Sequence, residues 1–489
     1  MRYSTVINDK LNDSLLTHLL RKDGQEDLCF ATYLPSSGEK RYTGILQSLI
    51  LPNDGERQVH GNVSFNENYF ERALLIAADR KEGLVLLHSH PRSKGWQHMS
   101  YDDIAAESKL APAVLGMTEY PLQGLTLAGN GDWCSRFWIK DPKKKRHFNK
   151  CWSESVRIFG NKLKVTFNPD NIPSKIDPKK QLRTISAWGM KTQEDISRLR
   201  IGIVGLGSVG SIVAEILART GFTNFTLIDF DGVEEKNLDR LTNVFKKDIG
   251  KAKVKVISKA MQRSSSAGKI VVNSNEYSIC EKKGFKDALD CDILFSCVDR
   301  PWPRLILNHI AYAHLIPVID GGISVRTNDN NTCLTGADWK AQTVGYGRSC
   351  LECLGQYSPG DAKLEIDGML DKPQYINQLS KNDRKRVDAH ENVYAFSSYV
   401  ASMEIIQLLT LLVAPEEFGD IGQHTYHMIP GEMAMDTSIK CHENCYHQKI
   451  LGRADLSGAT LFDRHEIAEK TRSSRNKTFK RKLLHFFNF

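Results

Sequence analysis

A glycine-rich run, GLGSVG at 205–210, joins an apolar segment to a sequence with helical spacing. Gly205, Gly207 and Gly210 allow the backbone to turn tightly and approach phosphates, and the following helix offers free N–H groups to anionic oxygens. Asp229 ends the next apolar run, where a carboxylate can hold ribose hydroxyls. The glycine pattern also occurs in loops that only pack a helix on a strand, but together with Asp229 it predicts a nucleotide site.

Polar and charged residues further along the chain indicate which nucleotide chemistry to expect. Four of them follow the glycine run in this order: Asn237, Arg240, Lys253 and Asp299. An NAD-dependent dehydrogenase, the simplest alternative, does not need two cations at the phosphates. An enzyme whose substrate attacks the α-phosphate of ATP does, because negative charge builds on that phosphorus and on the departing pyrophosphate. Asp299, at the end of a later apolar run, is suited to hold Mg²⁺.

A second group of residues is typical of a zinc site. His88 and His90 end the apolar run LVLLHSH, and residues two apart on a strand point the same way, so both imidazoles can face one metal ion. Asp103 follows in SYDD, where Ser100 and the carboxylate also fit a helix-capping arrangement. The His-x-His directly upstream favours a His₂Asp zinc site with an open fourth position for an activated water.

Four further cysteines form two close pairs: Cys350, Cys353, Cys441 and Cys445. Such pairs are typical of a structural Zn²⁺ site with four thiolate ligands and no open position. The second pair has one extra residue between its cysteines, which leaves His442 or His447 as a substitute ligand. Free reduced thiols are the alternative.

The spacing of apolar residues divides the chain into four parts. Residues 1–140 alternate short apolar runs with Gly, Asn and Asp turns and predict a smaller α/β domain. A region rich in Lys, Pro and Asn, residues 141–180, is predicted to be a linker with one short ordered piece. Residues 181–455 form the nucleotide-binding domain, and 456–489 form a basic, aromatic tail that can clamp a partner, anionic lipid or nucleic acid, or stay without order.

Within 181–455, strand, helix and strand patterns follow one another from LRIGIVGLG through SVGSIVAEILARTG to FTLIDFD. This is a parallel βαβ unit, and the later apolar runs predict a doubly wound, Rossmann-like sheet. The apolar segment ENVYAFSSYVASMEIIQLLTLLV predicts a long helix in the core or at a dimer interface.

Composition excludes several classes of protein. The chain starts without the apolar core of a secretion signal, and no apolar run approaches the length of a membrane span. A formal charge of +8 over 489 residues is modest, so nucleic acid is not an expected partner. We therefore predict a cytoplasmic enzyme.

The motifs GLGSVG, LIDFDGVEEKNLDR, GKAKV and CVDR resemble the ThiF family, which includes sulfur-carrier adenylyltransferases and the adenylation domains of ubiquitin-activating enzymes. The resemblance runs from Gln181 to Cys445. It implies that Ser208 and Asp229 contact ATP. The remaining roles that it implies are phosphate binding by Asn237, Arg240 and Lys253, Mg²⁺ binding by Asp299, and an arginine contributed by a homodimer partner, Arg183 in QLRTISAWG.

The sequence HSHPRSKGWQHMSYDD resembles the JAB (JAMM) zinc peptidases, in which seven residues, rather than the nine found here, usually separate the second His from the Ser. The resemblance implies His88, His90 and Asp103 as zinc ligands and Ser100 as an oxyanion contact. Glu26 matches the general base of that family, with Glu39 and Glu56 as alternatives.

These resemblances lead to one favoured hypothesis and two alternatives. In the first, the chain adenylates the C-terminal carboxylate of a ubiquitin-like protein, which its peptidase domain processes or removes, in a bacterial and antiviral pathway with a separate conjugating enzyme. In the second, the substrate is a sulfur carrier for cofactor or cysteine synthesis. This suits the lack of cysteine between Leu354 and Asn392, which leaves only Cys333 nearby for a thioester. The third is a nucleotide-binding scaffold with an inactive JAB domain.

Overall fold

The computed structural model describes all residues except 61, 145–146, 329–332, 379–391, 416 and 488–489. The chain forms two compact units. The first consists of Met1–Ser174, Ala313–Leu315 and Ile450–Gly458, and the second of Lys175–Tyr312, Ile316–Lys449 and Ala459–Phe489.

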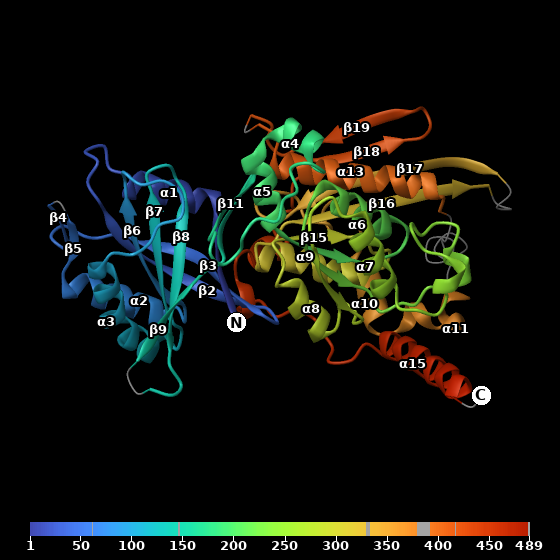
Figure 1. The fold of residues 1–489 in the computed structure, drawn as a ribbon, viewed down its shortest axis with the longest axis horizontal. Coiled ribbons are helices and arrows are strands. Elements are labelled where there is room, and N and C mark those ends of the chain that lie inside the picture. The colour runs from blue at the N-terminus through green and yellow to red at the C-terminus, as the bar shows by residue number, and fades with distance from the viewer. Residues whose placement is uncertain (61, 145–146, 329–332, 379–391, 416, 488–489) are drawn as a thin grey trace. The chain divides into compact units, whose positions relative to one another are not determined.

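The first unit is built on a nine-stranded mixed sheet with the order β11-β10-β1-β3-β2-β6-β7-β8-β9 (Figure 1). Its strands are β1 (Arg2–Asn8), β2 (Leu28–Ser37), β3 (Arg41–Ile50), β6 (Gly83–His90), β7 (Leu122–Ala128), β8 (Trp133–Lys140), β9 (Phe148–Trp152), β10 (Ser155–Phe159) and β11 (Leu163–Phe167). A separate pair is formed by β4 (Arg57–His60) and β5 (Asn62–Phe65), and the helices are α1 (Asp9–Leu19), α2 (Glu67–Asp79) and α3 (Tyr101–Thr118).

Both faces of this sheet are covered, because successive residues of its central strands point to opposite sides. Cys29 of β2 belongs to the same buried cluster as Leu15 of α1. Its neighbour Phe30 belongs to the cluster with Tyr69 of α2 and Val114 of α3. The predicted α/β architecture of the smaller domain is therefore confirmed.

The segment predicted to be a linker differs from that prediction. Strands β9, β10 and β11 lie within 141–180, and β10 pairs in parallel with β1. Each of these short strands lies in sequence rich in Lys, Asn and Pro, which hides its few apolar residues.

The second unit is built on an eight-stranded sheet with the order β14-β13-β12-β15-β16-β17-β18-β19. The strands are β12 (Arg200–Val204), β13 (Asn224–Ile228), β14 (Val271–Asn275), β15 (Ile293–Ser296), β16 (Val318–Thr327), β17 (Leu334–Val344), β18 (Gln423–His427) and β19 (Glu432–Asp436). The strands from β14 to β16 pair in parallel and those from β16 to β19 antiparallel, which confirms the doubly wound, Rossmann-like prediction.

Helices precede and connect these strands. They are α4 (Leu182–Trp188), α5 (Met190–Arg198), α6 (Ser208–Thr220), α7 (Lys253–Ser264), α8 (Lys282–Ala288), α9 (Pro301–Ala313), α10 (Pro359–Ile366), α11 (Pro373–Ile376), α13 (Tyr394–Leu412), α14 (Tyr446–Lys449) and α15 (Glu466–Phe487), with short 3₁₀ turns η1 (Glu235–Asn237), η2 (Lys246–Asp248), η3 (Met369–Asp371) and η4 (Ala454–Leu456).

The long apolar helix α13 packs on α6 and on strands β16 and β17. By length and composition it is the one helix among the described residues that could cross a membrane, but half of its most apolar window is buried inside the protein. A core helix of a globular domain has these properties, and the packing agrees with the core position predicted for it.

Strand order fixes where a ligand can bind. β12 lies between β13 and β15, so the connections from β12 and β15 leave the sheet in opposite directions. In such a sheet the carboxyl ends of the strands at this switch point border a crevice where ligands bind. The glycine run, Asp229 and Asp299 follow the three strands that meet there.

Candidate functional site

The glycine run makes a tight turn that only glycine can form. Gly205 has a φ of +86°, and a Cβ there would lie 2.4 Å from the carbonyl oxygen of Cys297 in the loop after β15. A Cβ on Gly210 would lie 2.0 Å from the carbonyl oxygen of Gly205. A Cβ added to Gly207, the N-cap residue of α6, would have no atom within 4 Å, so there is open space beside the backbone here. The backbone can therefore approach a phosphate at the start of α6.

Asp229 is bonded to the glycine run. Its carboxylate accepts hydrogen bonds from the backbone N–H of Leu206 (2.6 Å) and of Asp231 (2.7 Å). Burial raises the pKa of Asp229, and the nearby Lys253 ammonium opposes that rise. The two backbone bonds hold the carboxylate at the crevice, beside the glycine run.

Lys253, the first residue of α7, is 8% exposed. Its ammonium donates to Asp231 at 2.9 Å. Burial alone lowers the pKa of Lys253, but the carboxylates of Asp229 and Asp231, with a smaller effect from Asp299, raise it above its usual value. The structure therefore brings one permanent cation and three carboxylates together at the carboxyl ends of the strands.

The other predicted nucleotide residues make local contacts. Asn237 in η1 accepts from the N–H of Glu234 at 3.1 Å, and Arg240 donates to the carbonyl of Lys236 at 2.6 Å and to Asp239 at 2.9 Å. Arg240 therefore does not share the ion pair of Lys253.

Arg183 and Ser208 complete the set. Arg183 is exposed on α4, before the first strand of the unit. Ser208 is nearly buried at the start of α6, where its hydroxyl accepts from the amide of Asn392 at 3.2 Å. Asn392 and Asp231 were not among the predicted site residues. Asp231 was detectable, because in the sequence DFD it lies two positions from Asp229.

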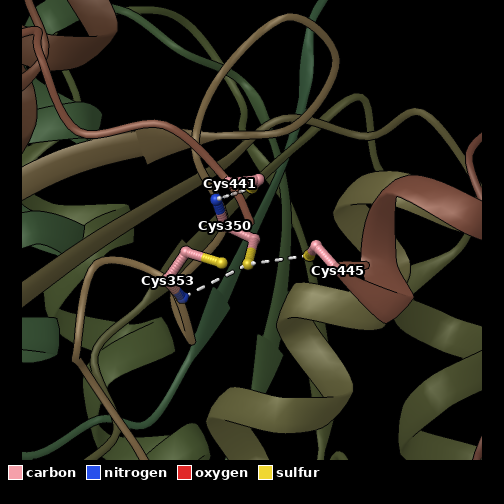
Figure 2. A group of neighbouring side chains, drawn as sticks. All are labelled: Cys350, Cys353, Cys441 and Cys445. Atoms are coloured by element: carbon pink, nitrogen blue, oxygen red, sulfur yellow. Dashed lines mark hydrogen bonds between the residues drawn. The ribbon is translucent and has the colours of Figure 1, made fainter. Parts of the chain in front are cut away.

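The four paired cysteines lie together, and their sulfur atoms are all within 4.8 Å of one another (Figure 2). The sulfurs of Cys350 and Cys445 are 3.6 Å apart, close to the separation of two thiolates on a tetrahedral Zn²⁺. Cys441 accepts the backbone N–H of Cys350 at 3.2 Å. Hydrogen bonding between the two thiols lowers the pKa of Cys441 and raises that of Cys350, so these two neighbouring sulfurs share a proton when no metal is bound. This donor set fits a structural zinc ion.

Neither histidine is needed to complete that set. His447 is buried and makes a 3.0 Å hydrogen bond with the hydroxyl of Tyr357. The additional residue between Cys441 and Cys445 therefore does not prevent all four thiols from converging, and His442 remains outside the cluster of candidate ligands.

His88, His90 and Asp103 also converge, and their ligand atoms lie within 4.8 Å of one another. Nε2 of His88 is 3.2 Å from Nε2 of His90 and 3.5 Å from the Asp103 carboxylate. Asp103 forms a capping box with Ser100 at the start of α3, which confirms the capping interpretation and leaves the carboxylate a candidate metal ligand. The capping bonds fix it where it faces the two imidazoles.

Burial and then the charge of Arg136 lower the pKa of His88 to about 3, which keeps the imidazole neutral, as metal binding requires. Arg136 is fully buried, donates to the hydroxyl of Thr126 at 2.6 Å and pairs with Glu107. The Thr126 hydroxyl lies 3.3 Å from Nε2 of His88. This arrangement could not be predicted from the sequence, because its members lie on separate elements.

Glu26 is the proposed base that is best placed. Burial raises its pKa, and the charges of His90 and Asp103 act on it, so it lies within electrostatic reach of the two candidate ligands. Glu56 instead pairs with Arg72 at 2.6 Å, which lowers the pKa of Glu56 to about 2. Glu39 lies in the turn between β2 and β3.

Comparisons with known proteins identify relatives of the second unit. Residues 179–442 match the ThiF family. A molybdopterin-synthase adenylyltransferase of Escherichia coli (strain K12) is 28% identical over 164 residues, covering 34% of this chain and 61% of that enzyme. A ubiquitin-like modifier-activating enzyme 5 of Aedes aegypti is 27% identical over 160 residues, covering 30% of this chain and 40% of that enzyme. The matches therefore span less than two thirds of these relatives.

Among solved structures, the crystal structure of E. coli MccB with MccA-N7isoASN aligns with 56% of this chain and 77% of its own, with 17% identity and a TM-score of 0.40. E. coli tRNA N6-threonylcarbamoyladenosine dehydratase aligns with 30% of this chain and 66% of its own, at 24% identity and a TM-score of 0.28. The family match, in contrast, covers more than half of the 489 residues. The chain belongs to the ThiF family.

Proposed function

We propose that this chain is an ATP-dependent adenylyltransferase for the C-terminal carboxylate of a ubiquitin-like protein. The observation that supports this best is the hydrogen bond from Leu206 of the glycine run to Asp229, with Lys253 beside it. A carboxylate oxygen of the substrate attacks the α-phosphorus of ATP, the bond between the α-phosphorus and the bridging oxygen breaks, and pyrophosphate leaves. Lys253 offsets the negative charge that develops.

The roles of the remaining residues follow from their chemistry. Mg²⁺, when bound, neutralises phosphate charge, and Asp299 is its proposed protein ligand. Arg240 and Asn237 hold the phosphates after a rotation of the Arg240 side chain away from Lys236. Arg183, exposed on α4, reaches the site of the other subunit in a homodimer.

The thiols of Cys350, Cys353, Cys441 and Cys445 hold a structural zinc ion in this proposal. The pairs are 91 residues apart in sequence, at Cys350 and Cys441, so the ion fastens two distant segments of the second unit.

The first unit is proposed to be a JAB-type peptidase that acts on the same modifier. His88, His90 and Asp103 hold a second zinc ion, which polarises a water molecule and the scissile carbonyl when bound. Glu26, which lies within electrostatic reach of His90 and Asp103, would accept the proton of that water. Ser100 stabilises the oxyanion.

These two activities on one chain suit a bacterial modification pathway in the cytoplasm, with a separate conjugating enzyme and a role in antiviral defence. Processing exposes the modifier's C-terminal carboxylate, and adenylation then activates it.

Activation of a sulfur carrier is the second candidate. It is favoured by the lack of cysteine from Leu354 to Asn392 and by the likeness to a molybdopterin-synthase adenylyltransferase. Cys333, the nearby thiol, is exposed. Thiocarboxylate formation by the activated carrier, with no protein conjugate, would select this function.

ATP–pyrophosphate exchange that requires a small ubiquitin-like protein is the decisive experiment. We expect exchange with the wild type and a loss of roughly 10²-fold or more in Arg240→Ala. Nucleotide binding without exchange for any ubiquitin-like or sulfur-carrier protein would instead support a binding scaffold. Glu26→Gln is expected to retain both zinc ions and the exchange activity but to lose cleavage of a modifier extended at its C-terminus.

A further inference from the structure

Helix α15 packs against the loops that follow β13 and β14, and the residue before it, His465, packs against α9. Ala468, Arg472 and Arg475 are spaced by four and three residues, so they share one side of α15, and His465 directly precedes the helix. The ring of His465 contacts Trp302 and Phe230, with centroid distances of 5.0 Å and 5.8 Å, and Ala468 is fully buried. The tail, for which the sequence left binding to a partner, lipid or nucleic acid and lack of order as alternatives, is thus from Ala459 to Arg475 an ordered part of the second unit.

Arg475 bonds to the centre of the candidate nucleotide site. Its Nη1 donates to the carbonyl oxygen of Phe230 at 2.9 Å, and Phe230 is the residue between Asp229 and Asp231. Its other terminal nitrogen pairs with Glu276, after β14. The Arg475 side chain is 11% exposed, so both bonds are largely shielded from water.

Arg472, one turn earlier, fastens the helix to the neighbouring loop. Its guanidinium makes two 2.8 Å bonds to the carboxylate of Glu281, which is 1% exposed, and lies 4.4 Å above the ring of Tyr277. These contacts fix the position of α15, and thereby the direction from which Arg475 reaches Phe230.

We infer that Arg475 is a positioning residue for nucleotide binding, acting through the backbone of Phe230. The inference rests on the proposed adenylation site. Asp229 bonds to the glycine run and Asp231 to Lys253, so the peptide units around Phe230 set the distance between these two groups. A charge-assisted bond to the Phe230 carbonyl resists rotation of those units. Arg475 itself touches neither the nucleotide nor the reacting atoms.

The test compares Arg475→Gln and Arg475→Lys with the wild type. Lys470→Ala is the control, because Lys470 lies on α15 but forms only an exposed pair with Glu466. Three quantities are measured on the full chain: the Kd for MgATP by calorimetry, KM and kcat in pyrophosphate exchange, and hydrogen–deuterium exchange of the peptide 229–233.

For Arg475→Gln we expect the Kd and KM for ATP to rise roughly 10-fold while kcat changes less than about threefold, the size expected for losing one charge-assisted bond. Peptide 229–233 should exchange faster in the absence of ATP. Lysine can keep only part of the two contacts, so Arg475→Lys should give about a threefold rise in KM. Lys470→Ala should match the wild type.

Wild-type Kd, KM and exchange of 229–233 in both Arg475 variants would overturn the inference and leave adenylation intact. If Arg475→Gln does not fold, the same result for Arg475→Lys alone overturns it. An equal loss of kcat and affinity, with exchange increased throughout the second unit, would mean that Arg475 only stabilises the fold. A wild type that binds no ATP would reject the proposed function, and exchange of 229–233 would still test the bond to Phe230.

Discussion

The ammonium of Lys253 lies 2.9 Å from the carboxylate of Asp231, two residues beyond the Asp229 that bonds to the glycine run. This pair keeps a nearly buried lysine charged at the point where ATP phosphates are proposed to bind. In the proposed site, Asp231, whose side chain is 46% exposed, stabilises the cation until phosphate oxygens take its place.

Replacing Lys253 by alanine should lower the kcat of pyrophosphate exchange roughly 10²- to 10³-fold, because the developing charge loses a preorganised partner. Lys259→Ala is the matched control, since Lys259 is exposed on the same helix. Initial rates with saturating ATP would measure the effect. Equal activity of the two variants would show that Lys253 is not at the reacting phosphates.

Cys350→Ser should remove one zinc ion per chain and lower the melting temperature of the second unit by at least about 5 °C, because metal binding there contributes to folding. Cys333→Ser changes an exposed thiol outside the cluster and should alter neither quantity. Metal analysis and calorimetry check both. Unchanged zinc content in Cys350→Ser would contradict a four-thiolate site.

His88→Ala should remove the other zinc ion and abolish cleavage of an extended modifier, while pyrophosphate exchange continues. The comparison is His98→Ala, which changes an exposed imidazole in the loop after β6. Zinc content, peptidase activity and exchange measured on the same sample separate the two sites. A His88→Ala protein that still cleaves the modifier would rule out the proposed peptidase centre.

Glu107→Ala should destabilise the first unit by about 3 to 5 kcal/mol, because it leaves the fully buried Arg136 guanidinium without its partner. The exposed Lys109, on the same helix, provides the control Lys109→Ala. Calorimetry measures the change in the free energy of unfolding. A change of less than about 1 kcal/mol would mean that water reaches Arg136.

Acid should weaken the second unit through His309. Burial lowers the pKa of His309 to about 4, below its value of 6.5 in the unfolded chain, so the unfolded state binds more protons between those values. Stability is therefore full above about pH 6.5 and falls as the pH drops towards 4, by about 1 to 2 kcal/mol at pH 5. His309→Gln should reduce the fall in melting temperature between pH 7 and pH 5, and the exposed His60→Gln should not.

The sequence alone predicted the positions of candidate site residues where a motif spans one strand and the turn after it. The glycine run, Asp229 and the His-x-His pair are of this kind, since the spacing alone sets which way their backbone or side chains face. The paired cysteines could be assigned to one site because a structural zinc ion needs four ligands. The extra residue between Cys441 and Cys445 left His442 and His447 as alternative ligands.

Contacts between distant segments could not be predicted. Thr126, Arg136 and Glu107 meet behind His88 only because β7, β8 and α3 are neighbours in the folded sheet. Arg475 and Phe230 are 245 residues apart, and the basic composition around Arg475 equally suits an external anion. The five-residue strands β9 to β11 were missed because pairing with neighbours, rather than their own apolar pattern, stabilises them.

The return of Ile450–Gly458 to the first unit has a consequence for synthesis on the ribosome. Gln47 of β3 donates to the carbonyl of Gly452, and the backbone of Ser37 donates to Asp455. Neither bond can form until more than nine tenths of the chain has been translated. The N-terminal sheet is therefore without these contacts on β2 and β3 while the second unit is made. A peptide ending at Ser174 would never gain the bonds that Gln47 and Ser37 make to this segment.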